Sequence, residues 1–316
     1  MEFLKSAIFG MGIGAVEGLP ISSCGHVLLF KHIFGQGESL LTLLPILYVG
    51  VLIAIICVYY KLIWYLAKAF FKIFADVFTR RFSFNGCDQL QNMALAIGIG
   101  VTPLFFIFFP VVGSGTNILG IIREFSDENN VILLGLSFLI NGVLLRLGAN
   151  NLKSDKYRYT YKTSDNVTRH WEGRKKFTIM DAIWCGAIYF ASMIFPGVSH
   201  IGAVFSIGII RGINKKIALD YSFLLGIPLL LIILLSEVSL SVRFGGFSNF
   251  NIYTALVGVL FSLIFGFLFI KVFKRMVEKN KISIFAFYNF VFGVSLLAIG
   301  IFEEIKGVNV FQGTIL

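Results

Sequence analysis

Residues 17–26 read Glu-Gly-Leu-Pro-Ile-Ser-Ser-Cys-Gly-His, and they interrupt an otherwise apolar run over residues 7–34. A second apolar run, residues 179–211, is interrupted in the same manner at Pro196 and Gly197. Because proline stops one helix and the residues after it restart another, each run predicts two short helices joined by irregular backbone. The arrangement of the remaining chain follows from these two breaks.

The composition places both breaks in a membrane protein. The 316 residues are 57% hydrophobic and only 14% charged, and the mean hydropathy is +0.85. A soluble domain is about 45–50% apolar and roughly 25% charged, and a disordered chain has low hydrophobicity, so both classes are excluded. The four cysteines form no CxxC pair and no cluster with histidine, which argues against a disulfide framework or a structural zinc site.

Six further apolar segments have about the length of a bilayer-crossing helix, which needs about 20 mostly apolar residues. They lie near residues 40–60, 93–112, 131–147, 217–236, 251–270 and 284–302. The sequence therefore predicts an all-α polytopic membrane protein with about six transmembrane helices.

We interpret the two broken runs as re-entrant helical hairpins, each of which returns to the side of the membrane from which it enters. Irregular backbone at membrane depth survives only where protein buries it or where it lines a wet cavity, and small polar residues follow each break. The alternative is a pair of kinked helices that cross the membrane. The two interpretations predict different positions for the charged loops.

The basic residues favour the hairpins. With six spans and two hairpins, one face of the membrane holds all of the 27 Lys and Arg residues except Lys5, Lys31, Arg123, Arg243 and Lys306. The positive-inside rule makes this face cytoplasmic and places both termini outside, whereas eight crossing helices would divide the basic loops between the two faces. The net charge of +10 is then a topology signal, and a nucleic-acid partner is not needed to explain it.

The order of the elements repeats. A broken run followed by three spans occurs in residues 7–147 and again in residues 179–302, and the two hairpins enter from opposite sides. We therefore predict one integral membrane domain over residues 1–316, with an inverted-topology repeat and a solvated cytoplasmic linker over residues 148–178. Inverted repeats with broken helices place a binding site near the midplane, where the half-helix N-termini meet.

The first break carries the parts of a catalytic site. A carboxylate inside an apolar run is costly, so Glu17 is a candidate functional group. The hydroxyls of Ser22 and Ser23 lie where a helix restarts, among free N–H groups suited to an anion. His26 shares their helix face. Carboxylate, hydroxyl and imidazole together supply a nucleophile with an acid–base partner.

The second break supplies another hydroxyl, Ser199, another imidazole, His200, and another helix N-terminus. If the two tips meet, the pocket contains two positive helix ends, as a diphosphate requires. Structural interpretations exist for the same residues, because serine caps helices, a buried carboxylate such as Glu17 can bind backbone N–H groups, and His26 can fill a core position. The clustering at one break, mirrored at the other, favours a functional role.

These residues resemble the bacitracin-resistance type undecaprenyl-diphosphatase family of bacterial inner-membrane enzymes. Residues 13–26, IGAVEGLPISSCGH, align without a gap with the family's first motif, (E/Q)GxTEFLPxSSxGH. Residues 196–202, PGVSHIG, correspond to its PGxSRSG motif. Residues 211–228 and 285–288 are similar to its RG…FSFLLxIP and FAxYR segments, so the similarity covers nearly the whole chain in order.

The resemblance implies hydrolysis of undecaprenyl diphosphate, a polyprenyl diphosphate lipid, to undecaprenyl phosphate at the outer face of the bacterial cytoplasmic membrane. This reaction recycles the carrier lipid for peptidoglycan synthesis and confers bacitracin resistance. The catalytic residues implied by position are Glu17, Ser22, Ser23 and His26. The phosphate-binding residues implied by position are Gly25, Gly197, Ser199 and His200. A divalent cation, Mg²⁺ or Ca²⁺, with Glu17 as a ligand is a further expectation.

Several motif positions differ from the family pattern. Ile13 replaces the first acidic or amide residue of the first motif, and Val16 replaces its threonine. His200 and Ile201 replace the arginine and the serine of the second motif, and Asn289 replaces the arginine of the last. Arginine carries a permanent charge and binds phosphate in a bidentate manner, whereas histidine near neutral pH is only partly charged.

Two functions follow. In the first, a membrane lipid-diphosphate phosphatase, Ser22 or Ser23 attacks the terminal phosphate or positions a water, His26 moves the proton, and Glu17 orients His26 or holds a cation. The alternative is a non-catalytic or weakly catalytic relative that carries a polyprenyl phosphate across the membrane, which the inverted repeat and the replaced motif residues motivate. A purely structural role leaves the paired polar breaks unexplained.

Overall fold

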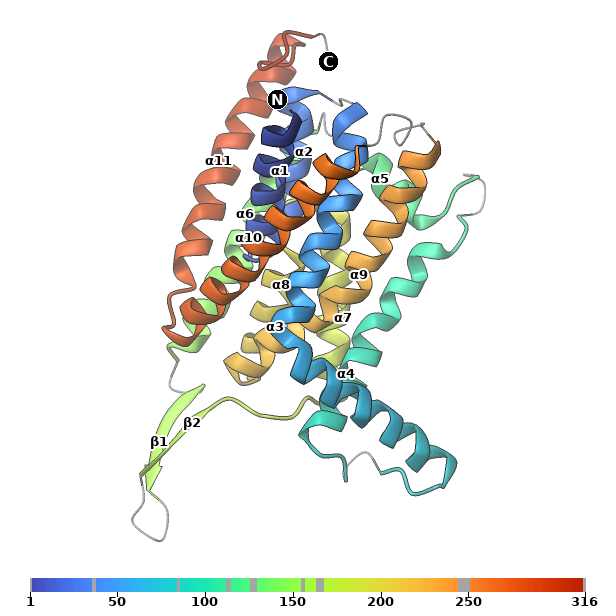
Figure 1. The fold of residues 1–316 in the computed structure, drawn as a ribbon. Helices are drawn as coiled ribbons and strands as arrows, with labels where there is room; N and C mark the ends of the chain where they lie inside the picture. Colours follow the sequence, from blue (N-terminus) through green and yellow to red (C-terminus); the bar gives the residue numbers. More distant parts are fainter. Residues whose placement is uncertain are drawn as a thin grey trace.

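The computed structural model describes residues 2–35, 38–83, 86–111, 115–125, 130–154, 157–162, 168–243 and 251–314. Figure 1 shows an elongated bundle of helices in which α1 begins and α11 ends at one end, while a small β-hairpin projects from the other. Within the described residues, six helical segments are long and apolar enough to cross a membrane. This finding confirms the predicted class of helical membrane protein.

The elements of the first half are α1 (Glu2–Glu17), α2 (Ser23–Phe34), α3 (Glu38–Phe78), α4 (Gln89–Val101), the 3₁₀ helix η1 (Thr102–Phe108), α5 (Ile118–Phe125) and α6 (Val131–Leu152). The two strands that follow are β1 (Arg158–Lys162) and β2 (Thr168–Glu172). The elements of the second half are α7 (Ile179–Ile194), α8 (His200–Ile210), α9 (Lys215–Arg243), α10 (Ile252–Glu278) and α11 (Ser283–Lys306).

The six candidate spans fall on the six predicted segments but differ from them in their bounds, the first most of all. The first continues to Phe78 within α3, because residues 61–78 contain no glycine or proline that would stop the helix. The second candidate span ends at Phe108, and its last part is the 3₁₀ helix η1. Pro103 lies in its first turn, where the missing N–H group interrupts the α-helical ladder.

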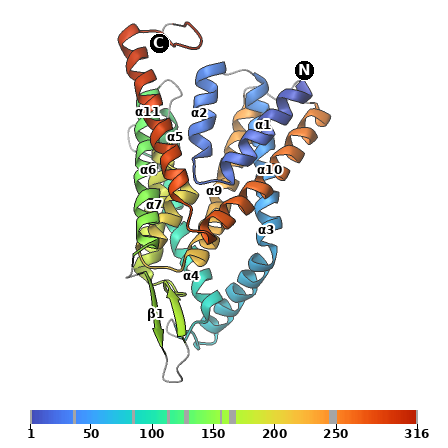
Figure 2. The ribbon, with the colours of Figure 1, turned by 90° about the vertical axis from the view of Figure 1, so that its left-hand side faces the viewer.

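Both breaks are present as helical hairpins. Figure 2 shows α1 and α2 side by side, joined by residues 18–22 near the middle of the bundle. They have 16 and 12 residues, and both are shorter than the about 20 residues of a crossing helix. α7 and α8, with 16 and 11 residues, pack against each other as a second pair. Their re-entrant placement in a membrane and the inverted repeat stay predictions.

The linker contains more structure than the solvated loop that we expected over residues 148–178. α6 continues to Leu152, and β1 then pairs with β2 in an antiparallel hairpin. The alternating tyrosine and threonine residues of β1 favour a strand. Residues 155–156 and 163–167 of the linker lie outside the described residues.

The connections that carry the basic residues meet at one end of the bundle (Figure 1). Lys215 at the start of α9 donates to the side chain of Asn280, between α10 and α11, at 2.9 Å. It also forms an ion pair with Glu172 of β2 at 3.6 Å. The ammonium group of Lys176 donates to the carbonyl of Cys87, between α3 and α4. The predicted basic face therefore corresponds to one end of the molecule.

α1 packs on α10 through a row of small residues. Gly10, Gly14 and Gly18 are spaced four residues apart and face α10. A methyl group added at Gly14 would lie 2.4 Å from the carbonyl oxygen of Ser262. Small residues in such a row let the backbones of two membrane helices approach closely. The close approach fixes α1, the helix that ends at Glu17.

α6 and α11 make a second close pair. A methyl group added at Gly135 of α6 would lie 2.9 Å from the carbonyl oxygen of Gly293 on α11, and one added at Gly142 would lie 3.1 Å from the ring of Phe290. The two helices therefore pack with little space between their backbones. This packing places the middle of α6 next to the first half of α11.

We expect Gly14→Ala to lower the free energy of unfolding by about 1–3 kcal/mol, because the added methyl group overlaps backbone that cannot move aside. Gly12→Ala is the matched control, since Gly12 is exposed and its added methyl group would have no atom within 4 Å. Alanine is favoured over glycine in a helix by about 1 kcal/mol, so the control should be no less stable than the wild type. Thermal unfolding in detergent measures both, and equal unfolding temperatures would contradict the close packing of α1 on α10.

Candidate active site

The first hairpin turns at a serine with an uncommon backbone conformation. Ser22 has a φ of 64° and a ψ of 103°, a combination that costs a residue other than glycine roughly 1–3 kcal/mol. Its hydroxyl donates to the carbonyl of Pro196 at 2.5 Å and accepts the N–H of Gly25 at 3.3 Å. Ser22 therefore caps α2 and joins the first tip to the second.

The next residue, Ser23, contacts the carboxylate. Its hydroxyl donates to Oε1 of Glu17 at 2.6 Å, a length typical of a strong hydrogen bond to a charged oxygen. Ser23 is 5% exposed and Glu17 is 2% exposed. Oε2 of Glu17 lies 3.7 Å from Nε2 of His200. One buried carboxylate thus lies between the hydroxyl of one tip and the imidazole of the other.

His26 is oriented by two hydrogen bonds. Nδ1 lies 2.6 Å from the carbonyl oxygen of Ser22, so this nitrogen carries a proton and donates it. Nε2 lies 2.7 Å from the hydroxyl of Tyr288 on α11, and in the neutral imidazole it accepts the hydroxyl proton. The ring of Phe292 stacks on His26 with centroids 5.1 Å apart, which fixes the plane of the imidazole.

The second tip repeats the serine cap. Ser199 accepts the N–H of Gly202 at 3.1 Å, and α8 begins at His200. Nε2 of His200 has no hydrogen-bond partner among the described residues, and it faces Glu17. Buried polar atoms are nearly always paired, so this nitrogen is a candidate donor or acceptor for a ligand oxygen.

The two tips touch each other. A methyl group added at Gly25 would lie 3.0 Å from the carbonyl oxygen of Pro196, and one added at Gly202 would lie 2.9 Å from Pro20. The N-termini of α2 and α8 therefore come together. Helix N-termini present unpaired N–H groups and a partial positive charge, which together bind anions.

The two predicted phosphate-binding glycines pack against α6. A methyl group added at Gly25 would lie 2.8 Å from the ring of Phe138. One added at Gly197 would lie 2.5 Å from the nitrogen of Phe138 and 2.8 Å from the carbonyl oxygen of Leu134. Both glycines thus allow a close approach of backbone, and their contact with phosphate stays a prediction.

Two features of the site were missed by sequence reasoning. Among the described hydrogen bonds and ion pairs, none joins Glu17 to His26, and the imidazole instead contacts Tyr288. Asn141, on α6, also reaches both tips. An amide in the middle of an apolar segment is a signal that could have identified Asn141, because a buried polar group requires a partner.

The described residues do not fit a resident metal ion. No three His, Cys, Asp or Glu side chains come together in the described part of the chain. Oε1 of Glu17 already accepts the hydroxyl of Ser23, and Ile13, one helical turn earlier, offers no oxygen. The divalent cation with Glu17 as its ligand stays a prediction that the described side chains do not support.

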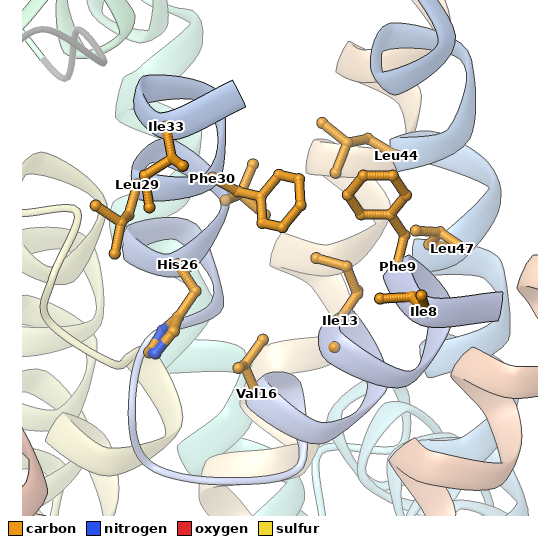
Figure 3. Close-up of a pocket in the computed structure, with 12 residues that line it drawn as sticks. Ile8, Phe9, Ile13, Val16, His26, Leu29, Phe30, Ile33, Leu44 and Leu47 are labelled. Atoms are coloured by element: carbon orange, nitrogen blue, oxygen red, sulfur yellow. The ribbon is translucent and has the colours of Figure 1, made fainter. Parts of the chain in front are cut away.

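An apolar cavity of about 260 Å³ lies between α1, α2 and α3 (Figure 3). Phe9 of α1 and Phe30 of α2 meet across it, with ring centroids 4.6 Å apart. His26 stands at the end near the turn of the hairpin, together with Val16. Ile13 lines the wall between these two ends. The cavity therefore leads from the site along the inside of the hairpin.

The far end of α2 is held by a second buried polar group. Nε2 of His32 lies 3.0 Å from both carboxylate oxygens of Glu303 on α11, and both residues are 1% exposed. Asn309 and Gln312, which follow α11, donate to the carbonyl of His32 at 3.1 and 2.8 Å. α2 is thus held at its tip by Ser22 and at its other end by the segment after α11.

We expect Glu303→Ala to lower the free energy of unfolding by about 3 kcal/mol, because it removes one partner of a buried pair and leaves His32 without it. Glu304→Ala is the control, since Glu304 is exposed, and it should change the stability by no more than about 0.5 kcal/mol. Thermal unfolding in detergent compares the two variants. If both unfold at the wild-type temperature, the contact does not hold α2.

These features define a class of protein, a helical membrane protein in which two hairpin tips enclose a hydroxyl, a carboxylate and imidazole groups beside an apolar cavity. The sequence family described as bacitracin resistance protein BacA matches residues 6–295 of this chain. The match includes both tips and nearly all of the described helices. The chain belongs to this family.

Relatives named undecaprenyl-diphosphatase are similar to this chain along almost its whole length. One from Alkaliphilus metalliredigens is 27% identical over 297 residues, which are 93% of this chain and 97% of the relative. One from Desulfosudis oleivorans is 30% identical over 307 residues, which are 95% and 99% of the two chains. One from Methanosphaera stadtmanae is 28% identical over 302 residues, with 95% and 99% covered.

Proposed function

We propose that this protein hydrolyses undecaprenyl diphosphate to undecaprenyl phosphate and inorganic phosphate. The observation that carries the proposal is the 2.6 Å contact between the Ser23 hydroxyl and Glu17, at the place where the N-termini of α2 and α8 meet. A buried hydroxyl with a carboxylate base is an activated nucleophile, and two helix ends suit the charge of a diphosphate. Family membership and the names of the relatives support the same reaction.

In the proposed first step, Ser23 Oγ attacks the terminal phosphorus while its proton passes to Glu17. The bond from that phosphorus to the bridging oxygen breaks, and the leaving oxygen takes the Nε2 proton of His26, which enters this step as the imidazolium and leaves it as the neutral imidazole. In the second step, water attacks the phosphoserine and gives a proton to His26, while Glu17 returns its proton to Ser23. Each positioned proton transfer contributes typically about 10²- to 10⁴-fold in rate.

Ser23, and not Ser22, is the proposed nucleophile. The hydroxyl of Ser22 both donates to Pro196 and accepts from Gly25, so it serves the cap and the contact between the tips. Among the described hydrogen bonds, the hydroxyl of Ser23 donates to Glu17, whose carboxylate can take its proton. Nε2 of His200 and the N–H groups of the first helical turns are the proposed ligands of the phosphate oxygens.

The apolar cavity is the proposed site for the first part of the prenyl chain. It begins at His26 and is lined on both arms of the hairpin by aliphatic and aromatic side chains (Figure 3). Because the prenyl chain comes from lipid or detergent and not from water, van der Waals contact with these side chains is what holds it. The site therefore distinguishes a lipid diphosphate from inorganic diphosphate through the chain, while the tips bind the part that both share.

We place the reaction at the outer face of the bacterial cytoplasmic membrane. The basic connections lie at the end of the bundle opposite to the start of α1 (Figure 1), and the positive-inside rule assigns that end to the cytoplasm. In the proposed inverted repeat of re-entrant hairpins, α7 is equivalent to α1 and α4 is equivalent to α10. The packing of α1 on α10 and of α7 on α4 agrees with this equivalence. The product is the carrier lipid of cell-wall synthesis, and removal of its diphosphate form accounts for bacitracin resistance.

Purified protein in detergent should release phosphate from undecaprenyl or farnesyl diphosphate. We expect Ser23→Ala and His26→Ala to lower kcat by about 100-fold or more, since each removes one proton-transfer or nucleophilic group. Ser295→Ala is the control, because in the described part of the chain this exposed serine bonds to the carbonyl of Val291 in its own helix and to no residue of the site. Phosphate release is measured for each variant with and without a divalent cation.

Full activity of Ser23→Ala would exclude Ser23 as the nucleophile. A wild-type protein that binds the lipid diphosphate without releasing phosphate would favour the alternative, a polyprenyl-phosphate carrier. In that event the combined His200→Arg and Ile13→Glu variant distinguishes a carrier from an inactive enzyme. A gain of activity in this variant identifies an enzyme that has lost motif residues.

The His200→Arg variant should change the pH dependence of the reaction. Imidazole loses its charge near neutral pH, whereas guanidinium keeps it, so the variant should gain most at high pH. We expect kcat/KM at pH 8 to rise about tenfold relative to the wild type, the scale of one hydrogen bond to a charged group, with a smaller gain at pH 6. The other residues of the site are the same in both proteins, so the ratio isolates residue 200. A ratio that does not change with pH would show that His200 does not bind the phosphate as a cation.

A further inference from the structure

The side chain of Asn141 joins the two hairpin tips. It lies midway along α6 and is completely buried. Its amide nitrogen donates to the carbonyl of Pro20 in the first tip at 3.0 Å. Its amide oxygen accepts the N–H of Ser199 in the second tip at 3.2 Å. One side chain therefore binds the backbone of both tips at once.

Both of these backbone groups are left without helical partners by the breaks. Pro20 follows the end of α1, and Ser199 precedes the first residue of α8. Among the described hydrogen bonds, neither the Pro20 carbonyl nor the Ser199 N–H has a partner other than Asn141. Buried backbone groups are almost always paired, so the conformation of each tip depends on this amide.

Asn289 sets the orientation of the Asn141 amide. Its own nitrogen donates to the carbonyl of Phe285 at 2.7 Å, which turns its oxygen toward Asn141. The nitrogen of Asn141 donates to that oxygen at 2.8 Å. A reversed Asn141 amide would place its oxygen against two other oxygens and its nitrogen against an N–H group. The donor is thus directed to Pro20 and the acceptor to Ser199.

We propose that Asn141 is a positioning residue for the diphosphatase reaction, an inference that rests on the function proposed above. Through Pro20 it sets the turn that presents Ser23, and through Ser199 it sets the start of α8 and hence His200. These two side chains contact opposite oxygens of Glu17. Asn141 therefore controls the distance between the nucleophile and a phosphate ligand without touching either of them.

The experiment compares Asn141→Leu with the wild type, using farnesyl diphosphate in detergent. Leucine keeps the volume of the side chain and removes the hydrogen bonds to both tips. Misplacement of reacting groups by about 1 Å costs about 100-fold in rate, so we expect kcat to fall about 100-fold. KM should change less than about threefold, because the residues that line the prenyl cavity are unchanged. Because a loss of folded protein would also lower the apparent kcat at an unchanged KM, kcat is expressed per folded protein, measured as the monodisperse fraction in size-exclusion chromatography.

Asn289→Leu is the second variant, because Asn289 bonds to neither tip among the described hydrogen bonds and should act through Asn141. We expect a fall in kcat of about tenfold, and a double variant no slower than Asn141→Leu, since the two residues form one network. Asn150→Leu, an exposed position on the same helix, is the control and should keep the wild-type kcat. Thermal unfolding of each variant accompanies the kinetics.

A folded Asn141→Leu variant with the wild-type kcat, or falls in kcat that add in the double variant, would overturn the inference while the proposed function stands. If the wild type itself releases no phosphate, the proposed function fails, and this role of Asn141 fails with it. A fall in kcat for Asn141→Leu and Asn289→Leu at unchanged KM, with Asn150→Leu unaffected, is the result that the geometry predicts.

Discussion

Irregular backbone inside an apolar bundle must find its hydrogen-bond partners within the protein, and the rest of this structure depends on how that requirement is met. Each tip is completed by the other. The carbonyl of Pro196 accepts the hydroxyl of Ser22, and the carbonyl of Pro20 shares the Asn141 side chain with the N–H of Ser199. The two hairpins are therefore stable only in contact, and that contact places Ser23, Glu17 and His200 together.

The basic side chains and the candidate site lie at different positions along the axis of the bundle. The basic connections lie at one end, whereas the tips present one carboxylate, two imidazoles and two helix N-termini. Helix ends provide a positive field that does not depend on pH, and His200 adds a charge only when it is protonated. The motif that residues 196–202 resemble has arginine at this position, so this chain has a weaker and variable charge at the proposed phosphate site.

The class of fold and the place of the site could be predicted from the sequence because they have local causes. Apolar length predicts the spans, and proline with glycine predicts the breaks. The partners within the site could not be predicted, since they depend on packing between distant segments. Glu17 contacts Ser23 and His200, and His26 instead contacts Tyr288 from α11. Nothing near Glu17 in the chain distinguishes these outcomes.

The glycine rows show the same limit. Gly10, Gly14 and Gly18 repeat at intervals of four, but the repeat alone does not say which helix they meet. The β-hairpin of the linker was also missed, although Tyr159 and Tyr161 alternate with polar residues, because the polar composition of the whole linker favoured a solvated loop over a short strand. The local sequence pattern thus predicts the helices and their breaks. Which helices pack against each other depends on the complete fold.

The contact between Ser22 and Pro196 spans 174 positions of the chain, and this has a consequence for biosynthesis. The first hairpin is made and inserted before its partner exists. Until the second hairpin follows, the Pro20 carbonyl and the Ser22 hydroxyl must be satisfied by water or by lipid headgroups. We therefore expect the first half to stay near an interface during synthesis, and the candidate active site to form only after the second hairpin is inserted.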